Sequence, residues 1–165
     1  MPTSSTTYRI RAATNADVPR IKEVVFAALE EYGLHPDPGG TDRDLDDVEV
    51  NYLARGGLFE VVVDDDGQVV GSAGLYPLSD GRVELRKMYL APSARRRGLG
   101  KQLLERMIGG ACRLGYQEIV LQTNAVLKEA VALYRRYEFT PTELQRLSPR
   151  CDQAYGLRLS DRQPR

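Results

Sequence analysis

Residues 83–107 read VELRKMYLAPSARRRGLGKQLLERM, in which a strand, a glycine-rich turn and a helix follow one another directly. Val83 to Leu90 has the composition of a strand, and Pro92 stops it. From Leu99 to Ala111, apolar residues recur at helical spacing, which predicts an amphipathic helix that ends near Gly115. The turn between the strand and the helix therefore lies at a helix N-terminus.

That turn, residues 95–101, reads RRRGLGK and combines four cations with two glycines. A helix N-terminus leaves about four amide N–H groups without partners and carries roughly half a positive charge, so its backbone can bind phosphate. Gly98 and Gly100 have no Cβ atom to block the close approach of a ligand. We therefore expect this turn to hold a pyrophosphate.

Two other nucleotide-binding patterns compete for the same turn. A Rossmann site needs GxGxxG in the first strand-to-helix turn and an acidic residue about 20 positions later, whereas here the spacing differs and several strands come first. The phosphate loop GxxxxGK[ST] needs Ser or Thr after its lysine, where this chain has Gln102. Because an RxxGxG string alone also suits an ordinary glycine-rich loop, the assignment depends on the rest of the chain.

The remaining chain supplies further strands and helices on both sides of this turn. The patterns predict strands at 8–12, 58–63, 68–76, 118–122 and 153–159 with a closing strand near Phe139, and helices at 17–32, 42–54 and 126–137. The helix at 42–54 is the weaker one. We predict an α/β (α+β) fold with a mixed, mostly antiparallel central sheet of six or seven strands and helices on both faces. Residues 1–165 are expected to form a single domain, with a core at about 8–160 and short flexible ends.

The composition restricts the class of protein. The 165 residues carry 23 basic and 23 acidic side chains, so no net charge draws the chain to nucleic acid or to an anionic membrane. No apolar run reaches the roughly 20 residues of a membrane-spanning helix, and the polar start does not resemble a signal peptide. Cys112 and Cys151 form no CxxC pair and His35 is the only histidine, which leaves no usual zinc ligand set. We expect a cytoplasmic protein without a metal, a nucleic-acid partner or a membrane partner, present as a monomer or homodimer.

Three segments, in order along the chain, form a pattern wider than the turn itself. Residues 84–92 read ELRKMYLAP, residues 95–100 read RRRGLG, and residues 130–139 read AVALYRRYEF. Together they resemble the GNAT superfamily of acyl-CoA-dependent N-acetyltransferases, including a bacterial subgroup with Glu-Leu-Lys-Arg-Leu-Tyr-Val before a proline. The likeness covers roughly residues 8–160. Two positions depart from the family pattern, since Leu127 stands where many members have Asn and Glu138 stands where they have Gly.

The resemblance implies that the chain binds acetyl-CoA, with its pyrophosphate on the turn at residues 95–101. It also implies that a backbone amide of Met88, Tyr89 or Leu90 stabilises the oxyanion of the reaction. The cofactor-binding residues that follow from the resemblance are Met88, Tyr89, Leu90, Arg95, Arg96, Arg97, Gly98, Leu99, Gly100, Lys101, Gln102, Thr123, Leu127 and Tyr134.

Two side chains are candidates for proton transfer. An amine must lose a proton before it attacks a thioester, yet the pKa of an unperturbed lysine is about 10.4. Glu84 is the candidate base, directly or through a water, because burial in a middle strand makes a carboxylate a stronger base. It could instead be a structural glutamate paired with Arg86 or Arg82. Tyr134, which the resemblance places at the cofactor sulfur, is the candidate donor to the leaving thiolate, although a tyrosine on an apolar helix face could simply pack.

The acceptor site is expected among the early helices, the loop around His35 and the last strands. Its candidate lining residues are Phe26, Glu30, Tyr32, Tyr76 and Tyr155, each of which could equally belong to the core or the surface. An acidic approach from Glu30, Asp37 and the following aspartates suits a cationic amine. The predicted function is acetyl transfer to a primary amine, either a small amine or amino acid or a protein N-terminus or lysine. The alternative is a catalytically silent module that binds acyl-CoA or a partner.

Overall fold

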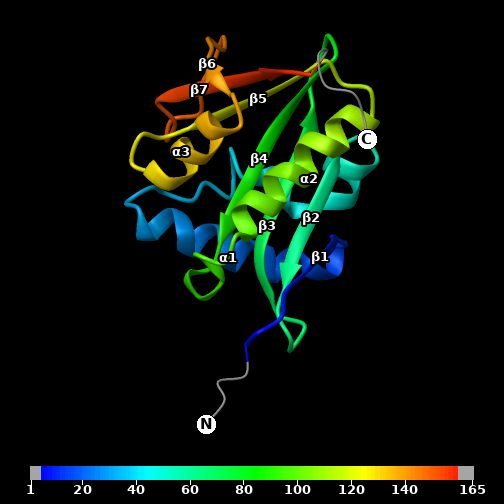
Figure 1. Cartoon of the computed structure of the whole chain (residues 1–165), viewed down its shortest axis with the longest axis vertical. Helices are drawn as coiled ribbons and strands as arrows, with labels where there is room; N and C mark the ends of the chain where they lie inside the picture. Colours follow the sequence, from blue (N-terminus) through cyan, green and yellow to red (C-terminus); the bar gives the residue numbers. More distant parts are fainter. Residues whose placement is uncertain (1–4, 160–165) are drawn as a thin grey trace.

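A computed structural model describes residues 5–159, and a seven-stranded sheet runs through its middle (Figure 1). Across the sheet the strands are β1 (Arg9–Ala12), β2 (Leu58–Val63), β3 (Val69–Pro77), β4 (Arg82–Leu90), β5 (Glu118–Thr123), β7 (Gln153–Arg158) and β6 (Thr140–Pro141). Neighbouring strands are antiparallel except β4 and β5, which are parallel. The expected mixed, mostly antiparallel sheet is confirmed. Of the flexible ends that the sequence predicts, residues 1–4 and 160–165 fall outside the described residues, whereas the amide of Thr7 donates to the carboxylate of Asp65 at 3.1 Å.

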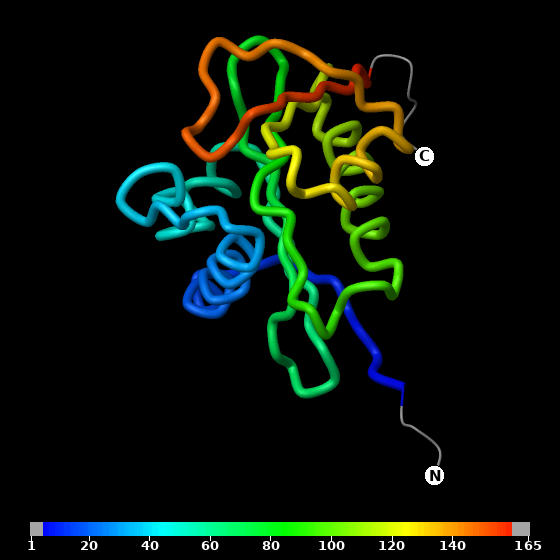
Figure 2. Tube along the Cα trace, turned by 90° about the vertical axis from the view of Figure 1, so that its left-hand side faces the viewer, coloured from blue at the N-terminus to red at the C-terminus, as the bar shows by residue number. Residues whose placement is uncertain are grey.

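Helices cover both faces of the sheet, which Figure 2 shows nearly edge-on. On one face, α1 (Val18–Glu31) and residues 33–54 enclose a core with β2 and β3. On the other face, α2 (Leu99–Arg113) and α3 (Lys128–Arg136) pack over a second core. The buried side chains of α1 are the ones that its apolar spacing predicts: Val18, Ile21, Val24, Val25, Ala28 and Leu29.

The segment expected to form a weak helix at 42–54 is not one helix. It contains a short 3₁₀ turn at Arg43–Asp46 and a single π-type turn at Glu49–Leu53. Between them Asp47 is extended, with φ −153°, and its carboxylate accepts hydrogen bonds from the amide of Val50 at 2.9 Å and from Asn15 at 2.8 Å. An aspartate that bonds nearby donors in this way competes with helix formation, so the helix prediction was wrong here.

The closing strand near Phe139 is shorter than expected. Phe139 is buried in the core, and β6 consists of Thr140 and Pro141 alone. Beyond Pro141 the contact with β7 continues through a single backbone hydrogen bond, from the amide of Thr142 to the carbonyl of Ala154 at 3.0 Å. The longer closing strand, β7, matches its prediction closely.

β4 bulges in the middle of the sheet. Opposite residues 72–74 of β3, β4 runs from Arg86 to Tyr89, so it has one residue more than its partner. Within this bulge Lys87 has a φ of 56°, a left-handed value that is rare for a residue with a Cβ atom. Neighbouring side chains in a regular strand point to opposite faces, but here Arg86 and Lys87 both contact Asp44. The bulge therefore turns two consecutive cations toward the same loop.

β4 and β5 pair over only part of their length. The parallel pairing joins residues 82–85 to residues 118–121 and then stops. Beyond Leu85 the two strands part, and within residues 5–159 no strand pairs with this edge of β4 at residues 86–90. The site described next lies in this opening.

Candidate active site

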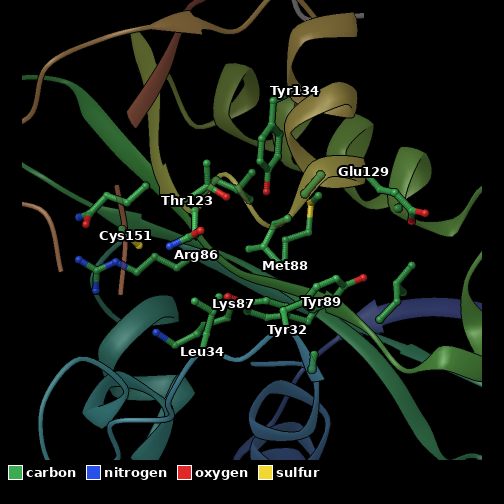
Figure 3. Close-up of a pocket in the computed structure, with 18 of the residues that line it drawn as sticks. Tyr32, Leu34, Arg86, Lys87, Met88, Tyr89, Thr123, Glu129, Tyr134 and Cys151 are labelled. Atoms are coloured by element: carbon green, nitrogen blue, oxygen red, sulfur yellow. The ribbon is translucent and has the colours of Figure 1, made fainter. Parts of the chain in front are cut away.

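A cavity of about 530 Å³ lies where β4 and β5 part. Figure 3 shows Tyr134 entering it from α3 on one side and Lys87, Met88 and Tyr89 from β4 on the other. Residues at the end of α1, with the loops around Leu34 and residues 148–151, close the remaining sides. Its volume is in the range of pockets that bind small molecules.

The turn before α2 presents unpaired backbone amides beside this cavity. Gly98 caps the helix with a φ of 76°, a left-handed value that glycine adopts without strain. Among the hydrogen bonds of residues 5–159, none is donated by the backbone amides of residues 97–101. An added Cβ would meet no atom within 4 Å at Gly98, and at Gly100 it would lie 3.8 Å from Leu90 and Leu133. The turn therefore offers several amides to an anion over an open surface.

The cations of the turn have different surroundings. Arg95 is held in place, because its Nε donates to the carbonyl of Leu90 at 3.1 Å and its guanidinium pairs with Glu31. It thereby ties the end of β4 to the end of α1. Arg96 and Lys101 are exposed to solvent next to the amides. Their charge adds to the positive potential of the helix N-terminus.

Most of the cofactor-binding residues expected from the sequence line the cavity, namely Met88, Tyr89, Leu90, Arg95, Arg96, Gly100, Thr123, Leu127 and Tyr134. Leu99 does not, because its side chain is buried in the core under α2. Arg97, Gly98, Lys101 and Gln102 are exposed on the turn, outside the cavity. The turn at residues 95–101 therefore faces the cavity through Arg95, Arg96 and Gly100, and faces solvent at Arg97, Gly98 and Lys101.

Tyr134 is buried on α3, and its ring packs 5.8 Å from that of Phe139. In Figure 3 its hydroxyl points away from the helix, toward Met88. Burial raises the pKa of Tyr134, and the neighbouring Tyr89 and Cys151 raise it further. The phenol therefore stays protonated at neutral pH and can donate a hydrogen bond or a proton.

Glu84 is buried on β4, opposite Val120 of β5, and its carboxylate lines the cavity. It forms an ion pair with Arg86 and accepts a hydrogen bond of 3.0 Å from Nε2 of Gln122. The other amide atom of Gln122, Oε1, accepts the backbone N–H of Ser148 at 2.7 Å, which fixes the orientation of the amide. The salt-bridged arrangement with Arg86 is thus present, and the carboxylate still faces the cavity. Its role as a base stays a prediction.

A buried cluster of charges connects the bulge of β4 to two distant loops. Nζ of Lys87 lies 3.0 Å from Oδ1 of Asp42 and 3.3 Å from Oδ1 of Asp44. Arg150 binds both oxygens of Asp42, each at 2.7 Å. Burial alone would raise the pKa of Asp42, but the hydrogen bonds from Arg150 and the charge of Lys87 lower it to about 2. Asp42 is therefore ionised at neutral pH and holds the three segments together.

The acceptor-site residues expected from the sequence are not all brought together. Tyr32 lines the cavity, whereas Phe26, Glu30, Tyr76 and Tyr155 do not. Phe26 packs against the core under α1, and Glu30 faces solvent. Tyr76 packs on the ring of Tyr52 at 5.5 Å, and Tyr155 is buried in the core on the other face. The sequence shows apolar character at these positions, but it does not distinguish a cavity wall from a core.

The expected acidic approach to the site also differs in the structure. Asp42 and Asp44 are paired with Lys87, Arg150 and Arg86, so they present no free negative charge to an acceptor. Of these five residues only the three cations line the cavity.

Several cavity residues were not expected from the sequence: Arg86, Lys87, Gln122, Ser148, Arg150 and Cys151. A signal existed for Arg86, which stands two positions after Glu84 and so shares its face of the strand. No local signal exists for Arg150, because its partner Asp42 is 108 positions away.

Comparison with known proteins identifies the class to which this fold and site belong. A sequence profile of the Acetyltransferase (GNAT) family matches residues 25–139. The Escherichia coli N-acetyltransferase YjgM is 38% identical over 135 residues, which cover 79% of this chain and 80% of that protein. N-acetyltransferase C1271.07c of Schizosaccharomyces pombe is 30% identical over 128 residues, 77% of this chain and 78% of that protein. The chain belongs to the GNAT family and is an N-acetyltransferase of that type.

Solved structures agree on the fold. A GNAT-family acetyltransferase of Staphylococcus aureus Mu50 superimposes with a TM-score of 0.87 at 22% identity, covering 93% of this chain and all of that one (100%). The Salmonella typhimurium acetyltransferase yncA superimposes with a TM-score of 0.73 at 24% identity, covering 96% of this chain and 98% of that one. Within residues 5–159, no helix combines the length and the apolar character needed to cross a membrane.

Proposed function

We propose that the chain transfers an acetyl group from acetyl-CoA to a primary amine. One arrangement supports this most strongly: the turn with unpaired amides borders a cavity that is also lined by Glu84 from β4 and by Tyr134 from α3. The structure of yncA holds acetyl-CoA, which supports the same donor for this chain. The residues present fit such a donor, since the surface at Gly98 and Gly100 is open to a pyrophosphate.

The two ends of the cavity would bind different parts of the donor. The amides of residues 97–101 would hold the pyrophosphate, and Arg96 and Lys101 would add charge from solvent. The unpaired edge of β4 at residues 86–90 would direct a backbone amide to the thioester oxygen. The acetyl group would then lie between Glu84 and Tyr134.

The transfer requires one bond to form and one to break. The protonated amine first gives a proton to Glu84, directly or through a water, and the neutral amine then attacks the thioester carbonyl. Solvent takes the second proton of the nitrogen as the amide N–C bond forms. The negative charge on the carbonyl oxygen is stabilised by an amide of Met88, Tyr89 or Leu90. The C–S bond then breaks, and Tyr134 gives its proton to the thiolate. Solvent carries the proton from Glu84 back to Tyr134, so the products are an N-acetylated amine and the free thiol of CoA.

Direct transfer is favoured over a covalent acetyl-cysteine, although Cys151 lines the cavity. Only the thiolate of a cysteine is a good nucleophile. Burial raises the pKa of Cys151, even though Ser148 donates a hydrogen bond to the sulfur at 3.2 Å and Arg150 lies nearby. The thiol is therefore held in its neutral form, and Cys151→Ala should retain turnover.

A thiol-release assay tests the proposed function. Acetyl-CoA is incubated with the protein and a panel of amino acids, amino-acid amides, simple alkylamines, diamines and lysine-containing peptides, and free CoA thiol is measured together with the mass of the acetylated product. The proposal predicts stoichiometric thiol and N-acetyl product with at least one amine. Thiol release by none of the panel members, with acetyl-CoA binding intact, would overturn it.

A further inference from the structure

The acceptor end of the cavity is lined by more cations than carboxylates. Arg86, Lys87 and Arg150 line it, whereas Glu84 is the carboxylate that faces them. The carboxylates that neutralise these cations, on Asp42 and Asp44, belong to the cluster behind the wall. A ligand beside Glu84 therefore meets the positive ends of these ion pairs, while the other carboxylate of the lining, Glu129, belongs to α3.

Two of the three cations have most of their donors occupied. Nζ of Lys87 is surrounded by three oxygens, since it lies 3.0 Å from Oδ1 of Asp42 and 3.3 Å from Oδ1 of Asp44 and donates to the carbonyl oxygen of Thr41 at 3.5 Å. Both terminal nitrogens of Arg150 bind Asp42. Lys87 and Arg150 therefore provide positive potential to the cavity and few free donors.

Arg86 differs from both. Its guanidinium has five N–H groups, and within residues 5–159 its only hydrogen bond runs from Nε to Glu84. Its ion pair with Asp44, at 3.5 Å, is longer than a hydrogen bond. The guanidinium carbon of Arg86 lies 3.8 Å from the centroid of the Tyr76 ring, and that of Arg55 lies 4.5 Å from the same centroid. Arg86 is thus held rigidly beside Glu84 with terminal donors left for a ligand.

We infer that the acceptor is a free α-amino acid, an inference that rests on the proposed function and narrows it. Its amino group would lie at Glu84 and its carboxylate at Arg86. These two side chains touch, and an α-amino acid likewise carries its amine and carboxylate on one carbon. A guanidinium binds a carboxylate through two parallel hydrogen bonds. A lysine side chain or a polyamine brings no carboxylate beside its reacting nitrogen, and a peptide N-terminus brings a neutral amide there.

The test compares each L-amino acid with its own α-amide, so that the side chain stays constant and the carboxylate alone is removed. We expect kcat/KM to be at least about 10-fold higher for the acid than for the amide of the preferred residue, the scale of a hydrogen bond to a charged group. Arg86→Gln should bring this ratio close to one. Arg113→Gln, at an exposed position of α2, is the matched control and should leave the ratio unchanged.

Arg86 also contacts Glu84, so its substitution can lower activity through Glu84 alone. The ratio of kcat/KM for the acid to kcat/KM for the amide distinguishes this structural effect from binding of the substrate carboxylate. A purely structural role would lower turnover of acid and amide equally and preserve the ratio, which would overturn the assignment of Arg86. Amides or simple alkylamines that are acetylated as well as the amino acids would overturn the inference and leave the proposed function standing. Thiol release with none of these amines would overturn the proposed function, and the inference with it.

Discussion

The two ends of the cavity present different kinds of group to a ligand, backbone amides at one end and side chains at the other. At the turn before α2, the proposed binding groups are the unpaired backbone amides of residues 97–101, and the neighbouring cations Arg96 and Lys101 are exposed. At the proposed acceptor end, the groups that face the cavity are side chains of β4 and Arg150, and buried ion pairs join Lys87 and Arg150 to the loop at residues 41–44 behind the wall. The groups at the turn come from one short segment of the chain. The groups at the acceptor end come from distant segments that only the folded chain brings together.

This difference has a physical consequence for what each end can tolerate. A backbone site keeps its donors through most substitutions, provided that nothing fills the space above them. A buried ion-pair cluster is sensitive to the loss of any member, because each removal leaves an unpaired charge. The predictions below test this contrast, beginning with the largest expected effect.

Gly100→Glu should nearly abolish acetyl-CoA binding while leaving the fold intact. The added Cβ finds ordinary contacts at 3.8 Å, but the carboxylate would occupy the space proposed for the pyrophosphate. Loss of two charge-assisted hydrogen bonds corresponds to an affinity decrease of about 1,000-fold. Calorimetry with acetyl-CoA measures the affinity and thermal unfolding checks the fold. Gly100→Ala is the matched control, and equal affinities for the Glu and Ala variants would contradict the assignment.

Glu84→Gln should lower turnover by about 100-fold or more while acetyl-CoA affinity stays nearly unchanged, because the base acts on the acceptor and not on the donor. The loss should shrink as pH rises, since more of the amine is then already neutral. The measurement is a pH–rate profile of the variant beside the native chain. Native turnover between neutral and mildly alkaline pH would show that Glu84 is structural.

These two variants concern features that could be predicted from the sequence, and the reason lies in their locality. Gly98 and Gly100 stand between a strand and a helix, so the position of the turn follows from the pattern of its neighbours. Glu84 lies on the strand that directly precedes this turn. The order of strands and helices was predictable for the same reason. The structure of the segment at 42–54 was not predictable in this way. Its helix is interrupted at Asp47, whose carboxylate accepts a hydrogen bond from the side chain of Asn15.

Tyr134→Phe should lower turnover by about 10- to 100-fold, the lower part of the range for a proton donor. Because burial raises the pKa of Tyr134, the native phenol stays protonated across the working pH range. The loss should therefore be nearly independent of pH, in contrast to that of Glu84→Gln. Parallel pH–rate profiles of the two variants measure this difference, and a rescue of Tyr134→Phe at high pH would argue against donation to the thiolate.

Asp42→Asn should reduce the decrease in unfolding free energy that the native chain shows as pH falls. The pKa of Asp42 is about 2 in the folded protein and 3.8 unperturbed, so its contribution is complete above about pH 5 and is lost as pH falls toward 2. The difference corresponds to about 2 kcal/mol of unfolding free energy. Denaturant unfolding at pH 6 and pH 2.5 gives the change for each chain. Asp46→Asn, at an exposed aspartate, is the control, and equal changes in all three chains would contradict this role of Asp42.

The acceptor end could not be read from the sequence, because its geometry depends on contacts between distant segments. Arg150 meets Asp42 across 108 positions, and Lys87 meets the same carboxylate through a bulge that no local pattern indicates. Tyr76 and Tyr155 are aromatic residues of the kind expected in a cavity wall. Tyr76 packs on Tyr52 instead, and Tyr155 is buried in the core. Of the residues expected to form an acidic approach, Asp42 and Asp44 pair with cations from other segments, whereas Glu30 and Asp37 are exposed, a difference that the acidic pattern of the sequence does not show.

The central claim is that backbone amides bind the donor and side chains bind the acceptor. Amide NMR spectra recorded during a titration with acetyl-CoA test it most directly, on the native chain and on a double variant Arg96→Gln/Lys101→Gln. We predict that the amide signals of residues 97–101 shift most and exchange more slowly with solvent in both chains, with weaker affinity in the variant. The claim would be contradicted if acetyl-CoA left the amide signals of residues 97–101 unchanged in the native chain. It would also be contradicted if these signals no longer shifted in the double variant at saturating acetyl-CoA.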